Sequence, residues 1–196
     1  MPTNANFWNQ SSLEPKRQFR WMLYISGMPQ FIVKTAKKPS FTVNESTHDF
    51  LNYKFYYPGR VTWNTVDVTI VDPIQPDSTA SLVNILNAAG YVLPSDFMAE
   101  GNRSAPTTIS KQAFVEAMGG QIHLVQIGAN SGAQVGQNVI EKWTLNNPWL
   151  TSVDFGQLDY GSDELVNLSM TIRYDWASLE LPEERLWSIN APSTVT

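Results

Sequence analysis

The most regular stretch of the chain reads Val166-Asn167-Leu168-Ser169-Met170-Thr171-Ile172-Arg173-Tyr174-Asp175-Trp176. Apolar and polar side chains alternate along it, and successive side chains of a β-strand point to opposite faces of a sheet. The stretch therefore predicts a strand with one buried face. Antiparallel sheets commonly face the core on one side and water on the other, so this alternation favours an antiparallel, mainly β fold.

Other extended segments surround this strand. Alternation over residues 19–25 stops at Gly27-Met28-Pro29 and resumes over 30–35, and we expect these two segments to pair as a hairpin. Pro58-Gly59 is expected to turn the chain, and no strand is expected beyond Ala177. The remaining predicted strands cover residues 40–47, 53–57, 61–71 (the longest), 121–127 and 138–145.

Two helices are expected beside the strands. Leu82, Ile85, Leu86 and Ala89 follow the spacing of one apolar helix face, with Asp77 or Ser78 as the N-cap and Gly90 just past the end. Residues 110–118 predict a second, short helix. The predicted architecture is thus a mainly β, antiparallel sandwich or barrel with one external α-helix and a second short one.

The length of 196 residues favours one domain. The polar start, residues 1–15, predicts a flexible N-terminal arm, and residues 16–176 predict the single β domain. Residues 177–196 predict a C-terminal extension.

Composition excludes several functional classes. The chain has 13 Lys plus Arg and 18 Asp plus Glu, a net charge of −5, and no cysteine. These values argue against a disulfide framework, a cysteine zinc site and a charge-driven nucleic-acid binder. Charged residues make up only 16%, against roughly 25% in an average domain. With 23 aromatic residues, this shortage of charge suggests that other protein covers much of the surface.

The start of the chain has no basic segment followed by an apolar one, so we expect no signal peptide. No apolar run approaches the ~20 residues of a membrane span. We therefore expect a soluble protein made in a cytoplasm.

A search for catalytic groups finds no convincing site. The glycine-rich loop at 128–137 lacks a Gly-Lys-Ser/Thr motif and joins two strands, so it favours a hairpin tip over a phosphate loop. His48 beside Asp49 and His123 within a strand favour structural roles. The carboxylate pairs Asp163/Glu164 and Glu183/Glu184 fit a turn and a tail. We expect no enzyme, no cofactor and no metal.

A monomer would leave part of one aromatic run exposed. Tyr53, Phe55, Tyr56 and Tyr57 present apolar surface on both faces of a predicted strand. Together with Lys34, Lys37, Lys38 and Arg60 they could form a stacking platform for single-stranded nucleic acid. An exposed apolar patch more often marks a protein interface, which we favour.

Two segments resemble a known family. The first runs from Val33-Lys34-Thr35-Ala36-Lys37-Lys38-Pro39 to Asn52-Tyr53-Lys54-Phe55-Tyr56-Tyr57-Pro58-Gly59-Arg60 and the strand ending at Asp72. The second runs from Trp143-Thr144-Leu145-Asn146-Asn147-Pro148-Trp149 through Val153-Asp154-Phe155-Gly156 to the strand ending Tyr174-Asp175-Trp176. Together, over roughly 19–72 and 138–176, they resemble the tail tube proteins of contractile-tailed (T4-like) bacteriophages. Against that family, residues 93–120 look longer than the usual link, so the resemblance implies an insertion there.

The resemblance implies a structural virion protein, assembled in the host cytoplasm. In that family six copies form a ring, rings stack into a tail tube, and the tube conducts DNA into the host. The implied partners are further copies, sheath, baseplate and tail-terminator proteins, and genomic DNA that passes without specific binding. The hairpin around residues 40–60 would contact neighbouring copies, through Phe41, Val43, Tyr53, Phe55, Tyr56, Tyr57 and Arg60.

Alternatives stay open. A baseplate tube-initiator ring, or the tube of a type VI secretion-like ejection machine, would share the fold. A sugar-binding or hydrolytic β-sandwich is the rival from another class. If six copies carry −5 each, a ring carries about −30, and we expect a negative lumen that repels the DNA backbone.

Overall fold

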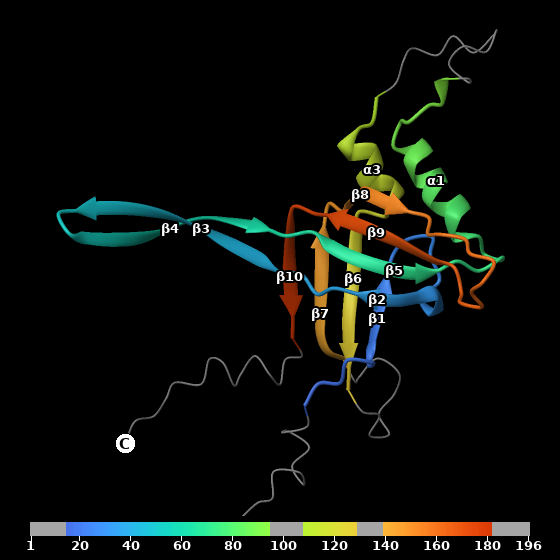
Figure 1. Cartoon of the computed structure of the whole chain (residues 1–196), viewed down its shortest axis with the longest axis horizontal. Helices are drawn as coiled ribbons and strands as arrows, with labels where there is room; N and C mark the ends of the chain where they lie inside the picture. Colours follow the sequence, from blue (N-terminus) through green and yellow to red (C-terminus); the bar gives the residue numbers. More distant parts are fainter. Residues whose placement is uncertain (1–14, 95–107, 129–138, 182–196) are drawn as a thin grey trace, which may run out of the picture.

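The computed structural model describes residues 15–94, 108–128 and 139–181. In this part of the chain, ten strands form three antiparallel sheets, and two α-helices and one short 3-10 helix accompany them (Figure 1). In chain order the elements are β1 (Trp21–Tyr24), η3 (Gln30–Ile32), β2 (Val33–Ala36), β3 (Phe41–Phe50), β4 (Tyr53–Trp63), β5 (Val66–Val71), α1 (Ser78–Ala88), α3 (Lys111–Ala117), β6 (Gln121–Ile127), β7 (Val139–Asn146), β8 (Trp149–Asp154), β9 (Asn167–Arg173) and β10 (Trp176–Glu180).

Two four-stranded sheets form the body of the molecule. Sheet A has the order β1-β6-β7-β10 and sheet B the order β2-β5-β9-β8. Their strands run crosswise in Figure 1, and the β3–β4 hairpin projects away from both. The predicted antiparallel, mainly β fold with two helices is confirmed.

The core lies between the two sheets because each turns its apolar side chains inward. In sheet B, β9 places Leu168, Met170 and Ile172 opposite Ile70, Val68 and Val66 of β5, and all six side chains are buried. The helices close one end of this layer with their own buried side chains. These are Leu82 and Ile85 of α1, Ala89, Phe114 of α3 and Met118.

The helix predictions are confirmed. Helix α1 begins after Asp77, whose carboxylate accepts a hydrogen bond from the Ala80 backbone N–H at 2.9 Å. Gly90 follows the helix with a φ of 106°, in the region that favours glycine. No helix in the part of the chain that the structure describes is long and apolar enough to cross a membrane.

The predicted hairpin between residues 19–25 and 30–35 is wrong. β1 pairs with β6, about a hundred residues further along the chain, whereas β2 pairs with β5 in the other sheet. Gly27, with a φ of 78°, and the η3 turn redirect the chain between the layers. A short connection therefore crosses from one sheet to the other here, although short connections usually join neighbouring strands.

Three strand boundaries also differ from expectation. The predicted strand 61–71 is interrupted at Asn64, whose backbone N–H donates to the Ser40 carbonyl at 2.8 Å. The final alternation ends at Arg173, so Trp176 lies in a new strand and is half exposed. The expectation of no strand beyond Ala177 is wrong, because β10 pairs with β7 over five residues. Strand β8 was not predicted from the sequence pattern.

Several predicted segments fall outside the described residues. They are the arm 1–15 except its last residue, residues 95–107 of the expected insertion, most of the loop 128–137, and residues 182–196 of the C-terminal extension with the pair Glu183/Glu184.

Candidate assembly interface

The β3–β4 hairpin is exposed along almost its whole length. Every residue of β3 is exposed, and so is every residue of β4 except its last, Trp63. In an ordinary half-buried strand alternate side chains would be covered. The hairpin therefore presents side chains on two faces, neither of which the rest of the chain covers.

Aromatic packing and hydrogen bonds attach the root of this hairpin to the body. The Phe41 ring meets Trp63 edge-on at 5.4 Å, and Trp63 in turn lies 6.0 Å from the buried Tyr174 ring. Arg173 Nη1 donates to the Trp63 carbonyl at 2.9 Å, and Asn64 Nδ2 to Ser40 Oγ at 3.1 Å. The direction in which the hairpin leaves the body is thus fixed from several sides.

Pro58-Gly59 does not turn the chain, which corrects the sequence prediction. Val43 pairs with Val61 but Glu45 pairs with Pro58, so β4 has one extra residue opposite Asn44. This extra residue is a β-bulge. A Cβ on Gly59 would lie 2.9 Å from the Asn44 carbonyl oxygen, so glycine permits the close approach of the two backbones. The chain reverses instead at Leu51 and Asn52.

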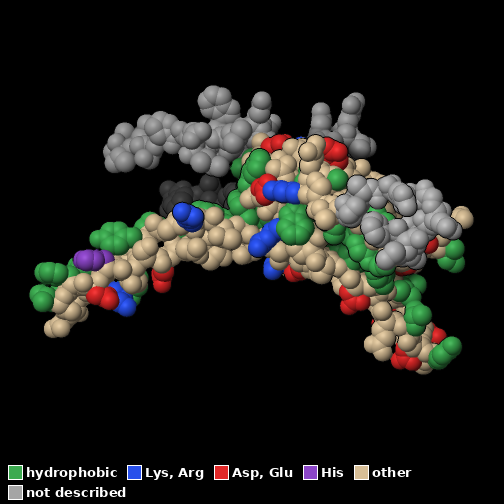
Figure 2. Space-filling view, turned by 90° about the horizontal axis from the view of Figure 1, so that it is seen from above, with side chains coloured by type: hydrophobic (Ala, Val, Ile, Leu, Met, Phe, Trp, Pro, Cys, Tyr) green, Lys and Arg blue, Asp and Glu red, His purple; other side chains and the backbone are tan. Residues whose placement is uncertain are grey.

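Beyond the bulge the two faces differ in chemistry. Directly paired residues share a face, so Tyr57, Phe55 and Tyr53 lie with Ser46, His48 and Phe50. We call this the aromatic face. The opposite face, which we call the charged face, carries Glu45, Thr47 and Asp49 with Pro58, Tyr56 and Lys54. Figure 2 shows hydrophobic side chains mostly along one side of the arm and charged ones along the other.

Before the bulge, the apolar side chains lie on the other face. Phe41 and Val43 pair with Trp63 and Val61, and alternation along β3 places them on the same face as Glu45 rather than Ser46. The bulge thus separates two apolar patches on opposite faces. We call these the root patch (Phe41, Val43, Val61) and the distal patch (Phe50, Tyr53, Phe55, Tyr57).

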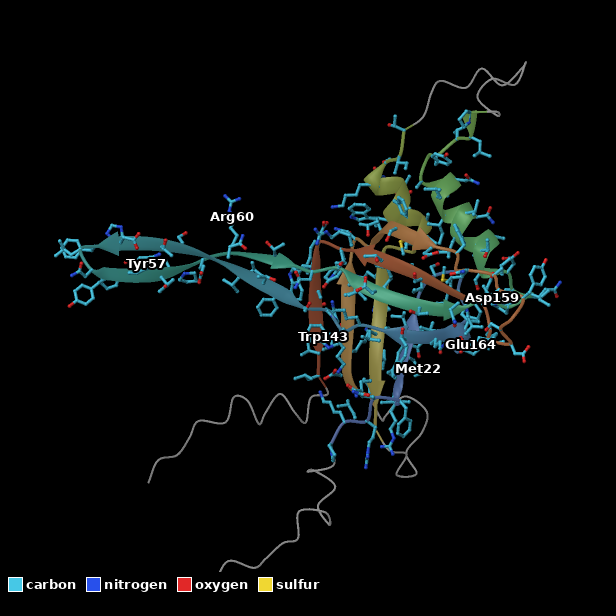
Figure 3. All side chains as sticks on the ribbon, viewed as in Figure 1. Met22, Tyr57, Arg60, Trp143, Asp159 and Glu164 are labelled. Atoms are coloured by element: carbon cyan, nitrogen blue, oxygen red, sulfur yellow. The ribbon has the colours of Figure 1, made fainter. Side chains whose placement is uncertain are left out.

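The predicted interface residues divide between these surfaces. Tyr53, Phe55 and Tyr57 belong to the distal patch, and Phe41 and Val43 to the root patch. Tyr56 lies on the charged face, and Arg60 lies at the bulge, where the two strands cross in Figure 3. Their role in assembly stays a prediction. Phe50 and Leu51 were not predicted as interface residues, because the strand predicted over 40–47 ends before them.

The lysines do not form a free basic platform. Lys37 lies 4.0 Å from Asp67, Lys34 donates to Asn167 Oδ1 at 3.2 Å, and Lys38 bonds Glu141. Each of these partners lies on the body rather than on the hairpin. The nucleic-acid platform considered from the sequence is therefore not assembled.

Glu141 is an unpredicted buried charge. Its side chain is only 6% exposed and accepts hydrogen bonds from Lys16 and Lys38, and Lys38 also reaches Gln126. Burial alone would raise the pKa of Glu141, but the bonds from the two lysines outweigh it and hold the pKa below its ordinary value. This cluster joins the start of the described chain and the β2–β3 connection to sheet A.

Among the described residues, the histidines and carboxylates singled out from the sequence do not gather into a catalytic group. His123 Nδ1 lies 3.0 Å from Thr144 Oγ1 on the outer face of sheet A, and burial and Lys142 lower its pKa. His48 is on the hairpin, far along the chain from Asp163 and Glu164 in the loop after β8. Among the described residues no three His, Cys, Asp or Glu side chains form a group that could hold a metal.

One acidic segment runs from the last residue of β8 toward β9. Asp154 ends β8, and Asp159, Asp163 and Glu164 follow in the β8–β9 connection, with no lysine or arginine among them. Figure 3 shows Asp159 and Glu164 at the end of the molecule opposite the hairpin. On the outer face of sheet A, by contrast, Lys142 pairs with Glu180 at 3.1 Å. The negative lumen stays a prediction.

Solved structures share this fold. A chain in the cryo-EM structure of the anti-feeding prophage cap, the tube-terminating cap, superposes with a TM-score of 0.57 and 13% identity over 86% of this chain and 93% of its own. A chain of the PVC sheath/tube terminator, from an extracellular contractile injection system, gives 0.58 and 12% over 85% and 97%. A chain of the PVC sheath-tube complex gives 0.56 and 12% over 88% and 95%.

At these identities the likeness shows the fold alone. No protein-family model matches the sequence, and no curated protein matches it.

Proposed function

We propose that this chain is a non-enzymatic, ring-forming subunit of the tube of a contractile injection particle. The observation that carries the proposal is the uncovered β3–β4 hairpin on a body that superposes with chains of tube terminators and a sheath-tube complex. A lone protein gains nothing from two exposed apolar patches, whereas a subunit with neighbours can bury both.

The open sheets support the same proposal. In the described part of the chain β1 and β10 are the edges of sheet A, and β2 and β8 are those of sheet B. Unpaired edges invite pairing with other chains. A closed ring of copies would satisfy such edges in a controlled way.

The position within the particle is a finer proposal. The superposed structures are a cap, a terminator and a sheath-tube complex, so they favour a tube or tube-end ring of an ejection machine over a phage tube in particular. Sheath and baseplate proteins are the expected partners. That the tube conducts DNA, as in a phage tail, stays a prediction.

Electron microscopy of the purified chain tests the proposal. We expect rings or stacked tubes in negative stain at high protein concentration. A matched variant replaces residues 44–60 with Asn-Gly, which joins the paired Val43 and Val61 by a short turn. This variant should keep the β-rich circular dichroism spectrum and lose assembly. Monomers of the intact chain at every concentration would overturn the proposal.

A further inference from the structure

The turn of the hairpin has an unusual residue at its tip. Leu51 is 85% exposed and has a φ of 53°, in the left-handed region that favours glycine and asparagine. Phe50 and Tyr53, which flank the turn, are also exposed. An exposed leucine in this conformation serves neither the turn nor the solubility of the chain, so its use indicates an apolar anchor for a partner.

The body has a pocket suited to such an anchor. It has a volume of about 720 Å³ and lies between β2 and the core side of sheet A. The pocket is lined near the far end of β6 by Leu124 and Gln126, whereas α3 closes the layer just before β6 begins. The helices therefore fill one end of the sandwich and leave this end open in the described chain.

The walls of this pocket match the hairpin tip in chemistry. Phe19, Trp21 and Trp143 provide aromatic surface. Three lysines against the single Glu141 give the lining a positive balance, and Asp49 lies two residues before Leu51.

The tip that fills the pocket must come from another copy. The hairpin ladder extends over ten residues of β3, about 33 Å at the usual rise of a strand. Figure 1 shows that it leads away from the body, so its own tip lies far from its own pocket. Contact between two different surfaces of identical chains is heterologous and continues from copy to copy.

We propose that Leu51 of one copy inserts between Trp21 and Trp143 of a neighbouring copy and anchors the hairpin there. This inference rests on the proposed ring-forming function and adds the surface that receives the hairpin. The distal patch then lies against the rim of the pocket, with Asp49 toward the rim lysines. The charged pair Lys54–Asp49, 3.9 Å apart, is loose enough to rearrange on docking.

Disulfide cross-linking tests the contact directly, because the chain has no cysteine. The test chain carries Leu51→Cys together with Gln18→Cys, at the exposed rim of the pocket. Mild oxidation should give a ladder of covalently linked copies in a non-reducing gel. Each single variant should give no product beyond a dimer. The matched control carries Leu51→Cys with Ile109→Cys, at a different pocket, and should give no ladder.

A second experiment separates anchoring from turn stability. Leu51→Asn suits the left-handed turn better, so the monomer should stay folded, but the protein concentration at half assembly should rise about tenfold or more. Leu51→Met keeps an apolar side chain and should assemble nearly as the parent does.

Rings or tubes that form without the Gln18 ladder, or that link through Ile109, would overturn the docking pocket and leave the proposed function standing. Normal assembly of Leu51→Asn would overturn it equally. A chain that never forms rings or tubes would overturn both.

Discussion

The sandwich body and the β3–β4 hairpin use the same antiparallel ladder for different purposes. In β9 alternation separates buried Leu168, Met170 and Ile172 from solvent-facing neighbours. In the distal hairpin alternation separates aromatic from charged residues, although both faces are exposed. Two chemically different faces that the chain itself leaves exposed indicate that partners outside the chain cover them. The comparison predicts that substitutions in the body change the stability of the monomer and those in the hairpin change assembly.

The largest effect is expected at the centre of the body. Ile172 is fully buried and pairs with Val66, so Ile172→Ala should lower the free energy of unfolding by about 2–5 kcal/mol. Urea denaturation followed by circular dichroism measures this. Ser169→Ala, on the exposed face of the same strand, is the control and should change it by less than about 0.5 kcal/mol. Equal effects would contradict a core between the sheets.

A smaller effect is expected at the Glu141 cluster. Glu141→Gln removes the charge that two partly exposed lysines neutralise, and should cost about 1–3 kcal/mol in unfolding free energy. Since the folded pKa lies below the ordinary 4.5, the carboxylate stabilises the fold above that value. This stability is lost as the pH falls from about 4.5 through the folded pKa. Between pH 7 and pH 3, the free energy of unfolding should therefore fall less steeply for Glu141→Gln than for the parent.

The bulge should show a local effect. Gly59→Ala would push a Cβ against the Asn44 carbonyl, at a cost of about 1–2 kcal/mol confined to the hairpin. Amide exchange over residues 44–60 should accelerate roughly tenfold, with β9 unchanged. Gly161→Ala is a matched control, because its Cβ would meet only the Asp159 carboxylate at an ordinary 3.5 Å. Global destabilisation by Gly59→Ala would show that the hairpin and body unfold together.

The smallest effect on the monomer is expected at the distal patch. Phe55→Ser and Tyr57→Ser replace exposed rings, so each should change the free energy of unfolding by less than about 0.5 kcal/mol. Both should nevertheless weaken assembly, measured as the concentration of protein at half sedimentation. A loss of more than about 1 kcal/mol in the monomer would mean that the hairpin belongs energetically to the body.

Local signals in the sequence predicted much of the body. Strand β9 and helix α1 were recognisable because burial, capping and periodicity leave marks within a few residues. Proximity along the chain predicted pairing correctly for the strands that flank the 128–137 loop, but wrongly for 19–25 with 30–35. β1 pairs with β6, and nothing near Trp21 specifies a partner so far away in sequence.

The candidate site shows the same division. Aromatic residues at 53–57 marked the hairpin as an interface candidate, but the extra residue at Gly59 reverses which side chains share a face. Pro-Gly is a common turn signal, and only the register of the paired strands shows it to be a bulge here. Glu141 was invisible because Lys16 and Lys38 lie over a hundred residues from it.

The switch of faces at the bulge has a kinetic consequence. With the root patch on one face and the distal patch on the other, two flanking molecules must be present before the whole hairpin is covered. A first encounter between two free copies buries only one patch, whereas a copy that adds to an existing end can bury both in succession. We therefore expect a long lag before assembly begins in solutions of the pure chain. Preformed seeds should abolish this lag, because they provide existing ends to which new copies add.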